Sequence, residues 1–126
     1  RPSVDSNIII GQEPMQGLVY QIGKIVVLRK SINADLLQGV VGLQVVNYGP
    51  YYALYEFVEG KTYTINAGSY SSTVYLDILD LDFNIIERKQ NFEDVIMNYS
   101  PSKTEYLVIR ILTAKEFAIT FTITPR

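Results

Sequence analysis

Three aspartates close together in the chain are the residues whose types and spacing could bind a metal. Asp77, Asp80 and Asp82 offer carboxylate oxygens, which Ca²⁺ prefers, and the spacing from Asp80 onward is similar to the first half of a calcium-binding loop. The second half does not follow, because Ile85 and Asn91 occupy the positions that require Gly and Glu. We therefore expect a hairpin turn in which Asp and Asn side chains bond to neighbouring backbone amides, with no metal or other cofactor. The three aspartates remain weak metal candidates.

Aromatic side chains are the second feature that could carry chemistry. The chain has ten Tyr and five Phe, and exposed rings stack on sugar rings or on peptide side chains. Core packing with hydroxyls at its rim accounts for most of these rings, and Trp, which has the largest ring for stacking, is absent. The candidate ligand-binding residues are Tyr48, Tyr51, Tyr55 and Tyr75.

The residues that most often carry catalysis are missing from this sequence, which contains no His and no Cys. The remaining routes are a pair of carboxylates or a Ser–Lys arrangement, and neither stands in a recognisable motif. A G-x-S-x-G motif, a phosphate-binding glycine loop and a dinucleotide fingerprint are also absent. We therefore expect a protein that is not an enzyme. A small hydrolase with two catalytic carboxylates is the alternative that this composition leaves.

Charge and hydropathy exclude two further classes. The net charge is −2, and the nearest approaches to a basic cluster are Arg29-Lys30 and Arg88-Lys89, so we expect no nucleic-acid partner. No stretch approaches the ~20 consecutive apolar residues of a membrane-spanning helix. The chain begins at Arg1 without an initiator Met, so we expect a processed or trimmed product. The sequence does not indicate the oligomeric state.

The sequence predicts that these candidate residues are positioned by strands. Short runs of alternating apolar and polar residues follow one another between turn signals. Alternation places Tyr75 and Asp77 on one face of their strand. In residues 105–112 the aliphatic face of Leu107, Ile109 and Ile111 is the better candidate for the core. The strands expected in this part of the chain are 51–58, 61–67, 73–79, 83–88, 92–99, 105–112 and 117–124, with a turn that begins at Gly68-Ser69.

The first part of the chain is less regular. Residues 1–17 could form an irregular N-terminal segment with a short strand at 7–10. Residues 18–30 predict two short strands, or one strand bent at Gly23. Residues 31–38 are the one place where a helical turn is expected. A further strand at 40–46 and a strong turn at 47–50 follow.

This pattern predicts an all-β fold. An antiparallel two-sheet β-sandwich with about eight or nine strands is favoured, because one solvated face per strand is typical of two packed sheets. Compact domains cluster at about 100–150 residues, so residues 1–126 are expected to form a single domain. Whether residues 1–50 complete the same sandwich stays open.

The order of the motifs after Tyr51 adds a resemblance. A tyrosine-rich strand at 51–57 is followed by the hairpin Glu59–Ile65, by the strand 74–80 that ends in an Asp turn, and by the segment 99–110 with Tyr106-Leu107-Val108. In this order, residues 51–124 resemble the bacterial pre-peptidase C-terminal domain, a jelly-roll-like β-sandwich appended to secreted enzymes and surface proteins. The chain departs from that pattern at Asp82-Phe83-Asn84, where a Gly is expected, and at Lys89-Gln90-Asn91, where an acidic stretch is common.

The resemblance implies a non-catalytic role and a location outside the cytoplasm, either secreted or in the cell envelope. We therefore expect an accessory module of an exported bacterial protein that binds a protein partner through its surface. The alternative is a carbohydrate-binding module that uses exposed Tyr side chains. A row of exposed rings on one sheet would favour this alternative.

Overall fold

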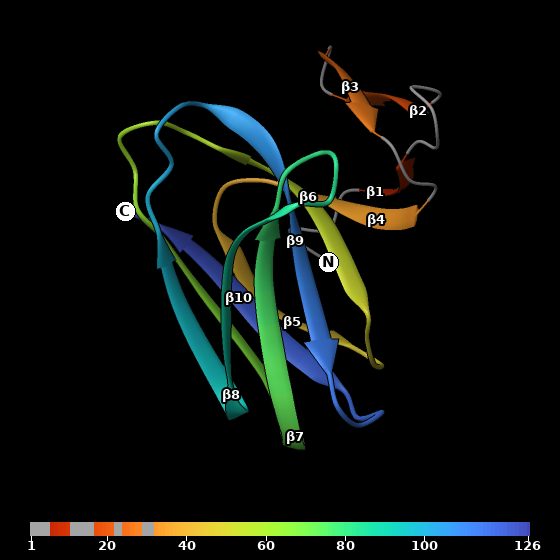
Figure 1. Ribbon diagram of the computed structural model, residues 1–126, viewed down its shortest axis with the longest axis vertical. Helices are drawn as coiled ribbons and strands as arrows, with labels where there is room; N and C mark the ends of the chain where they lie inside the picture. Colours follow the sequence, from red (N-terminus) through yellow and green to blue (C-terminus); the bar gives the residue numbers. More distant parts are fainter. Residues whose placement is uncertain (1–5, 11–16, 22–23, 29–31) are drawn as a thin grey trace.

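A computed structural model of the chain describes residues 6–10, 17–21, 24–28 and 32–126, with side chains from residue 34 onward. These residues form ten strands and no helix, which confirms the all-β prediction (Figure 1). The described part therefore contains no helix long and apolar enough to cross a membrane. The strands are β1 (Ser6–Ile10), β2 (Gly17–Gln21), β3 (Lys24–Leu28), β4 (Ile32–Leu37), β5 (Val41–Val46), β6 (Tyr51–Phe57), β7 (Tyr63–Leu79), β8 (Ile85–Tyr99), β9 (Glu105–Thr113) and β10 (Ile119–Pro125).

Eight of these strands join in one hydrogen-bonded sheet. Its continuous path has seven strands in the order β1-β4-β6-β9-β7-β10-β5, and β8 pairs with β7 beside this path. Neighbours are antiparallel except for β4 and β6, which are parallel. β2 and β3 form a separate two-stranded sheet. This strand pairing does not confirm the expected β-sandwich, in which two packed sheets would share eight or nine strands.

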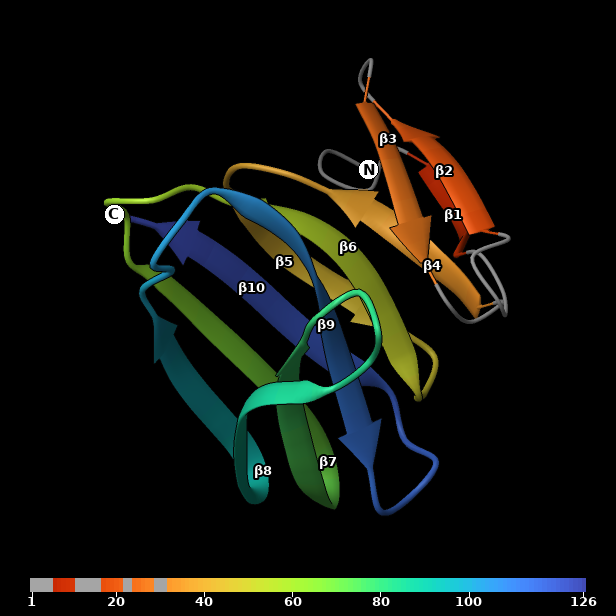
Figure 2. The same ribbon diagram turned by 45° about the horizontal axis from the view of Figure 1, so that its top comes forward.

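The large sheet curls, so that β6 faces β10 across a common core (Figure 2). The rings of Tyr51 on β6 and Phe121 on β10 have centroids 4.8 Å apart, although these strands are not neighbours in the sheet. Such curling lets one sheet bury its own apolar face, which a flat sheet of this size could not do alone.

β7 makes the curl possible because its two halves pair with different strands. Residues 63–69 pair with β10, whereas residues 74–79 pair with β9, and β8 follows β7 through both halves. The register between β7 and β8 jumps between Gly68 and Thr73, and Ser71 and Glu93 have positive φ angles of 53° and 66°. This irregularity bends both strands. The expected turn at Gly68-Ser69 was therefore wrong: it is a bend within one long strand.

The same correction applies to β8, which joins the two strands expected at 83–88 and 92–99. The helical turn expected at 31–38 was also wrong, because β4 occupies most of that segment and pairs with β6. Leu37 is fully buried there, so its packing against the sheet overrides a weak helical preference. The two short strands expected within 18–30 are confirmed as β2 and β3.

The core lies inside the curl and consists of the inward face of each strand. The predicted core face of β9, formed by Leu107, Ile109 and Ile111, is confirmed. Four rings pack edge-to-face at its centre, with Phe57 in contact with three others at centroid distances of 4.9–5.1 Å. These rings are Tyr55, Phe57, Tyr63 and Tyr99.

A smaller apolar cluster covers part of the outward face. Leu54, Leu79 and Val108 are buried there, and Phe83 from the β7–β8 loop packs on the ring of Tyr52 at 5.8 Å. The loop thus folds back over β6 and β9. The outward face stays accessible to solvent around the first half of β7. It also stays accessible along β8, which lies at an edge of the sheet.

Candidate functional site

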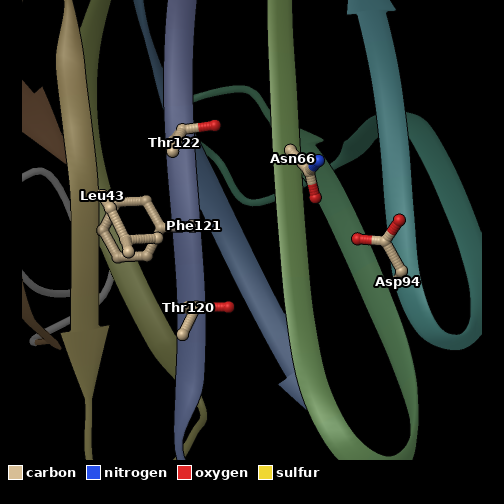
Figure 3. A pocket seen from close by; sticks show the side chains of 6 residues that line it. All are labelled: Leu43, Asn66, Asp94, Thr120, Phe121 and Thr122. Carbon is tan, nitrogen blue, oxygen red and sulfur yellow. The ribbon is translucent and has the colours of Figure 1, made fainter.

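The outward face of β5, β10, β7 and β8 carries a depression of about 230 Å³, here called the outer depression. Figure 3 shows that Thr120 and Thr122 of β10 lie beside Asn66 of β7, with Asp94 of β8 on the far side. Strand alternation produces this arrangement, because the residues between them on each strand point into the core. The lining residues are Leu43, Asn66, Asp94, Thr120, Phe121 and Thr122.

Four polar side chains in the outer depression have no hydrogen-bond or ion-pair partner among the described residues. They provide two hydroxyls, one amide and one carboxylate, which together donate and accept hydrogen bonds. Their neighbours along the same face behave differently, since Thr64 donates to Asn98 at 2.8 Å. The unpartnered residues are Asn66, Asp94, Thr120 and Thr122.

Gly68 deepens the surface between these groups because it has no side chain. A Cβ atom at this position would lie 3.0 Å from the backbone oxygen of Glu93, 3.4 Å from Oγ1 of Thr120 and 3.8 Å from Oδ1 of Asp94. The registers place Thr120 and Asp94 directly on either side of Gly68. The absence of a side chain at Gly68 therefore allows β8 to approach β7 closely. It also leaves open space between Thr120 and Asp94.

A second hollow of about 490 Å³ adjoins the outer depression and shares Asp94 and Thr120 with it. Ser69 also lines this hollow, and its Oγ is the one buried side-chain polar atom without a partner in the described part of the chain. Glu93 lines it as well and accepts a hydrogen bond from the backbone N–H of Ser71 at 2.9 Å.

Exposed aromatic rings lie at this end of the face. Tyr70 is 76% exposed, and its ring lies 5.9 Å from that of Phe117 in an edge-to-face arrangement. Tyr48, which was predicted as a ligand-binding residue, is also exposed. It follows β5 at the same end of the sheet, where Val46 pairs with Ile119.

The other predicted ligand-binding residues lie elsewhere. Tyr51 and Tyr55 point into the core, and their hydroxyls donate to Oδ2 of Asp35 at 2.9 Å and to the backbone oxygen of Gly39. Burial, together with the nearby Tyr63, raises the pKa of Tyr55. Neither ring is available to a ligand at the surface. Tyr75 is half-buried on the second half of β7, where the guanidinium of Arg88 lies 5.3 Å from its ring centroid.

The three candidate metal ligands have other partners. Asp77 is fully buried and binds two arginines, Arg88 and Arg110. Asp80 accepts hydrogen bonds from the backbone N–H of Asp82 at 2.9 Å and of Asn84 at 2.8 Å, which confirms the predicted hairpin turn. Within the described ranges, no three His, Cys, Asp or Glu side chains gather as metal ligands would.

Sequence reasoning missed the outer depression, although part of its signal was visible. Alternation within the expected strands 61–67 and 117–124 puts Asn66, Thr120 and Thr122 on the polar faces, and in the structure their buried neighbours do point to the other side. It could not show that β10 and β7 are neighbours, so it could not bring these residues together. Asp94 and Tyr70 lay near expected strand ends and carried no signal of their own.

Comparisons with known proteins give this chain no relative: no family model, no curated protein and no solved structure matches it.

Proposed function

We propose that this chain is a non-catalytic binding module that takes a polysaccharide in the outer depression. The observation that carries this proposal is the convergence of four unpartnered polar side chains on one open hollow. Sugar hydroxyls both donate and accept hydrogen bonds, so they complement a surface that offers hydroxyl, amide and carboxylate groups together. Ligand pockets place a few such groups among apolar ones, and Leu43 supplies an apolar edge.

The exposed rings support the same ligand. Tyr70 presents an aromatic surface at the end of the second hollow, where the flat face of a sugar ring can stack on it. A polysaccharide that continues from the outer depression into the second hollow would pass Asp94 and Thr120, which line both. This geometry favours a chain over a single sugar.

Two further features of the protein support this proposal. The absence of His and Cys from the sequence supports a non-catalytic role. The resemblance of residues 51–124 to the pre-peptidase C-terminal domain supports an exported bacterial protein. It also supports a jelly-roll-like sandwich, in which the two halves of β7, paired with β10 and with β9, would belong to different layers.

Affinity electrophoresis against a panel of soluble polysaccharides tests the proposal. We expect at least one neutral polysaccharide to retard the protein. Asp94→Asn and Tyr70→Ala should each weaken the affinity for that polysaccharide by about tenfold. Glu59→Gln makes the same type of charge removal at an exposed residue outside both hollows, so it should have no effect. Retardation by no polysaccharide, or equal retardation of all variants, would contradict the proposal.

A protein partner remains the second candidate because of β5. Among the described strands β5 has a neighbour on one side only, and Leu43 and Val45 expose more than 60% of their surfaces (69% and 64%). An extended segment of a partner could pair with such an edge. A photoreactive side chain at Val45 should then cross-link one protein in an extract of the source cells, whereas one at Glu59 should not. Cross-linking at neither position would contradict this candidate.

A further inference from the structure

The second half of β7 holds a charged cluster that the proposed polysaccharide site does not use. Oδ1 of Asp77 accepts a hydrogen bond from Nε of Arg88 at 2.6 Å, and Oδ2 accepts one from Nη2 of the same residue at 3.0 Å. Nε and Nη2 of Arg110 lie 3.0 and 2.9 Å from Oδ2. The two guanidinium groups therefore meet at one carboxylate oxygen and are neighbours on the outward face.

This cluster has an excess positive charge. Two guanidinium groups surround one carboxylate, and the hydrogen bonds that Arg88 donates to Asp77 raise the pKa of Arg88, partly offset by desolvation. Among the strand residues that the registers place next to Asp77, Arg88 and Arg110 on this face, none is acidic. These neighbours are Tyr52, Leu54, Tyr75, Leu79, Gln90, Val108 and Leu112.

Both arginines keep donors free. A guanidinium carries more N–H groups than the two that Asp77 occupies on each arginine, and neither arginine has a further hydrogen-bond or ion-pair partner among the described residues. Arg88 is 38% exposed and Arg110 18%, so solvent reaches both. Asp77, fully buried beneath them, fixes their orientation in advance, which lowers the entropy lost on binding a ligand.

We propose that Arg88 and Arg110 form a binding site for an oxyanion, namely a carboxylate or phosphate group, with Asp77 as the positioning residue. The fork of an arginine matches both groups geometrically, and a second arginine beside it adds charge without a further rearrangement. The ring of Tyr75 lies next to Arg88 and limits the site along β7. The site lies on the other half of β7 from the outer depression and does not depend on the function proposed for it.

NMR titration of the intact chain, followed at the arginine Nε–H signals, tests this inference. Sodium phosphate and sodium glucuronate are added separately at constant ionic strength, which chloride maintains. We expect Arg88 and Arg110 to shift together and to saturate, whereas Arg126, an exposed arginine at the chain end, should not. A response to phosphate alone identifies a phosphate site, and a response to glucuronate identifies a carboxylate site.

Two variants separate a specific site from general attraction. Arg88→Lys keeps the charge but loses the fork, so we expect about a tenfold weaker affinity with the fold retained. Lys103→Gln removes one exposed positive charge away from the cluster and should leave the affinity unchanged. The inference would be overturned if neither anion shifts the two arginines, if Arg126 shifts equally, or if Arg88→Lys binds as tightly as the unaltered protein.

Discussion

The two halves of β7 present polar residues on the same outward face but treat them in opposite ways. On the second half, Asp77 is fully buried and its two oxygens accept bonds from two arginines. On the first half, Asn66 lies at the surface beside Thr120 and Asp94, and none of these side chains has a partner among the described residues. The bend between Gly68 and Thr73 separates the two environments.

The difference shows how to distinguish polar groups that stabilise a fold from those that are available to a ligand. A buried carboxylate must be paired, because an unpaired one costs several kcal/mol. A polar side chain at an open surface needs no partner within the protein, because water can hydrogen-bond to it. Several such side chains in one hollow can therefore bind a ligand. Substitutions on the second half should therefore change stability, and those on the first half should change binding.

The largest effect is expected for Asp77→Asn. The substitution removes the charge that holds Arg88 and Arg110 together and leaves two positive groups side by side. We expect a loss of about 3 kcal/mol in the free energy of unfolding, near the lower end of the range for broken buried pairs because both arginines reach solvent. Urea denaturation measures it, with Glu59→Gln as the control. A loss below about 1 kcal/mol would remove the contrast between the two halves.

A smaller loss is expected for Gly68→Ala, which tests the bend itself. The added Cβ would meet the backbone oxygen of Glu93 at 3.0 Å, so β8 must shift, at a cost of about 2 kcal/mol. It would also narrow the space between Thr120 and Asp94 and weaken polysaccharide binding. Gly42→Ala is the matched control, since nothing lies within 4 Å of its Cβ position. Equal thermal stability of the two variants would show that β8 does not depend on this close approach.

Tyr55→Phe should cost about 1 kcal/mol, because it leaves the backbone oxygen of Gly39 without its hydroxyl donor. Burial raises the pKa of Tyr55 in the folded state, so the folded protein holds this proton more tightly than the unfolded chain. The stabilisation is complete below the ordinary Tyr pKa of about 10 and is lost as the pH rises above it. Urea denaturation between pH 8 and 11 should show a shallower decline for Tyr55→Phe than for the unaltered protein. Parallel declines would contradict this account, and Tyr48→Phe serves as the exposed control.

The smallest effect on stability is expected for Thr120→Val and Thr122→Val, within about 0.5 kcal/mol. Both changes preserve shape and remove only a hydroxyl without a partner among the described residues. Polysaccharide affinity should nevertheless fall by about tenfold in each. Thr124→Val makes the same change on the same face of β10, outside both hollows, and should bind normally. If all three variants bind alike, the hydroxyls of the outer depression do not contact the ligand.

The sequence predicted the inward faces of the strands well, because alternation reports burial directly. Leu107, Ile109 and Ile111 illustrate this. It failed where one local signal has two structural meanings. Gly68-Ser69 can begin a turn or a bend in a continuous strand, and only the pairing of β7 with β8 decides between them.

The candidate site was less predictable, because it depends on which strands become neighbours. Tyr75 and Asp77 were correctly placed on one face, yet the arginines that bind Asp77 come from β8 and β9. Tyr51 and Tyr55 were chosen for ring type alone, which does not separate the core face from an exposed one. Alternation gives the face of a residue, and topology gives its neighbours.

The most direct test of the central claim is a backbone amide NMR titration of the intact chain with oligosaccharides of cellulose, xylan and chitin. We predict that at least one of them shifts the signals around the outer depression, those of Asn66, Gly68, Asp94, Thr120 and Thr122, and leaves those around Asp77 unchanged. No shift with any oligosaccharide, or shifts confined to β5 or to the second half of β7, would contradict the claim that the first half of β7 carries the binding site.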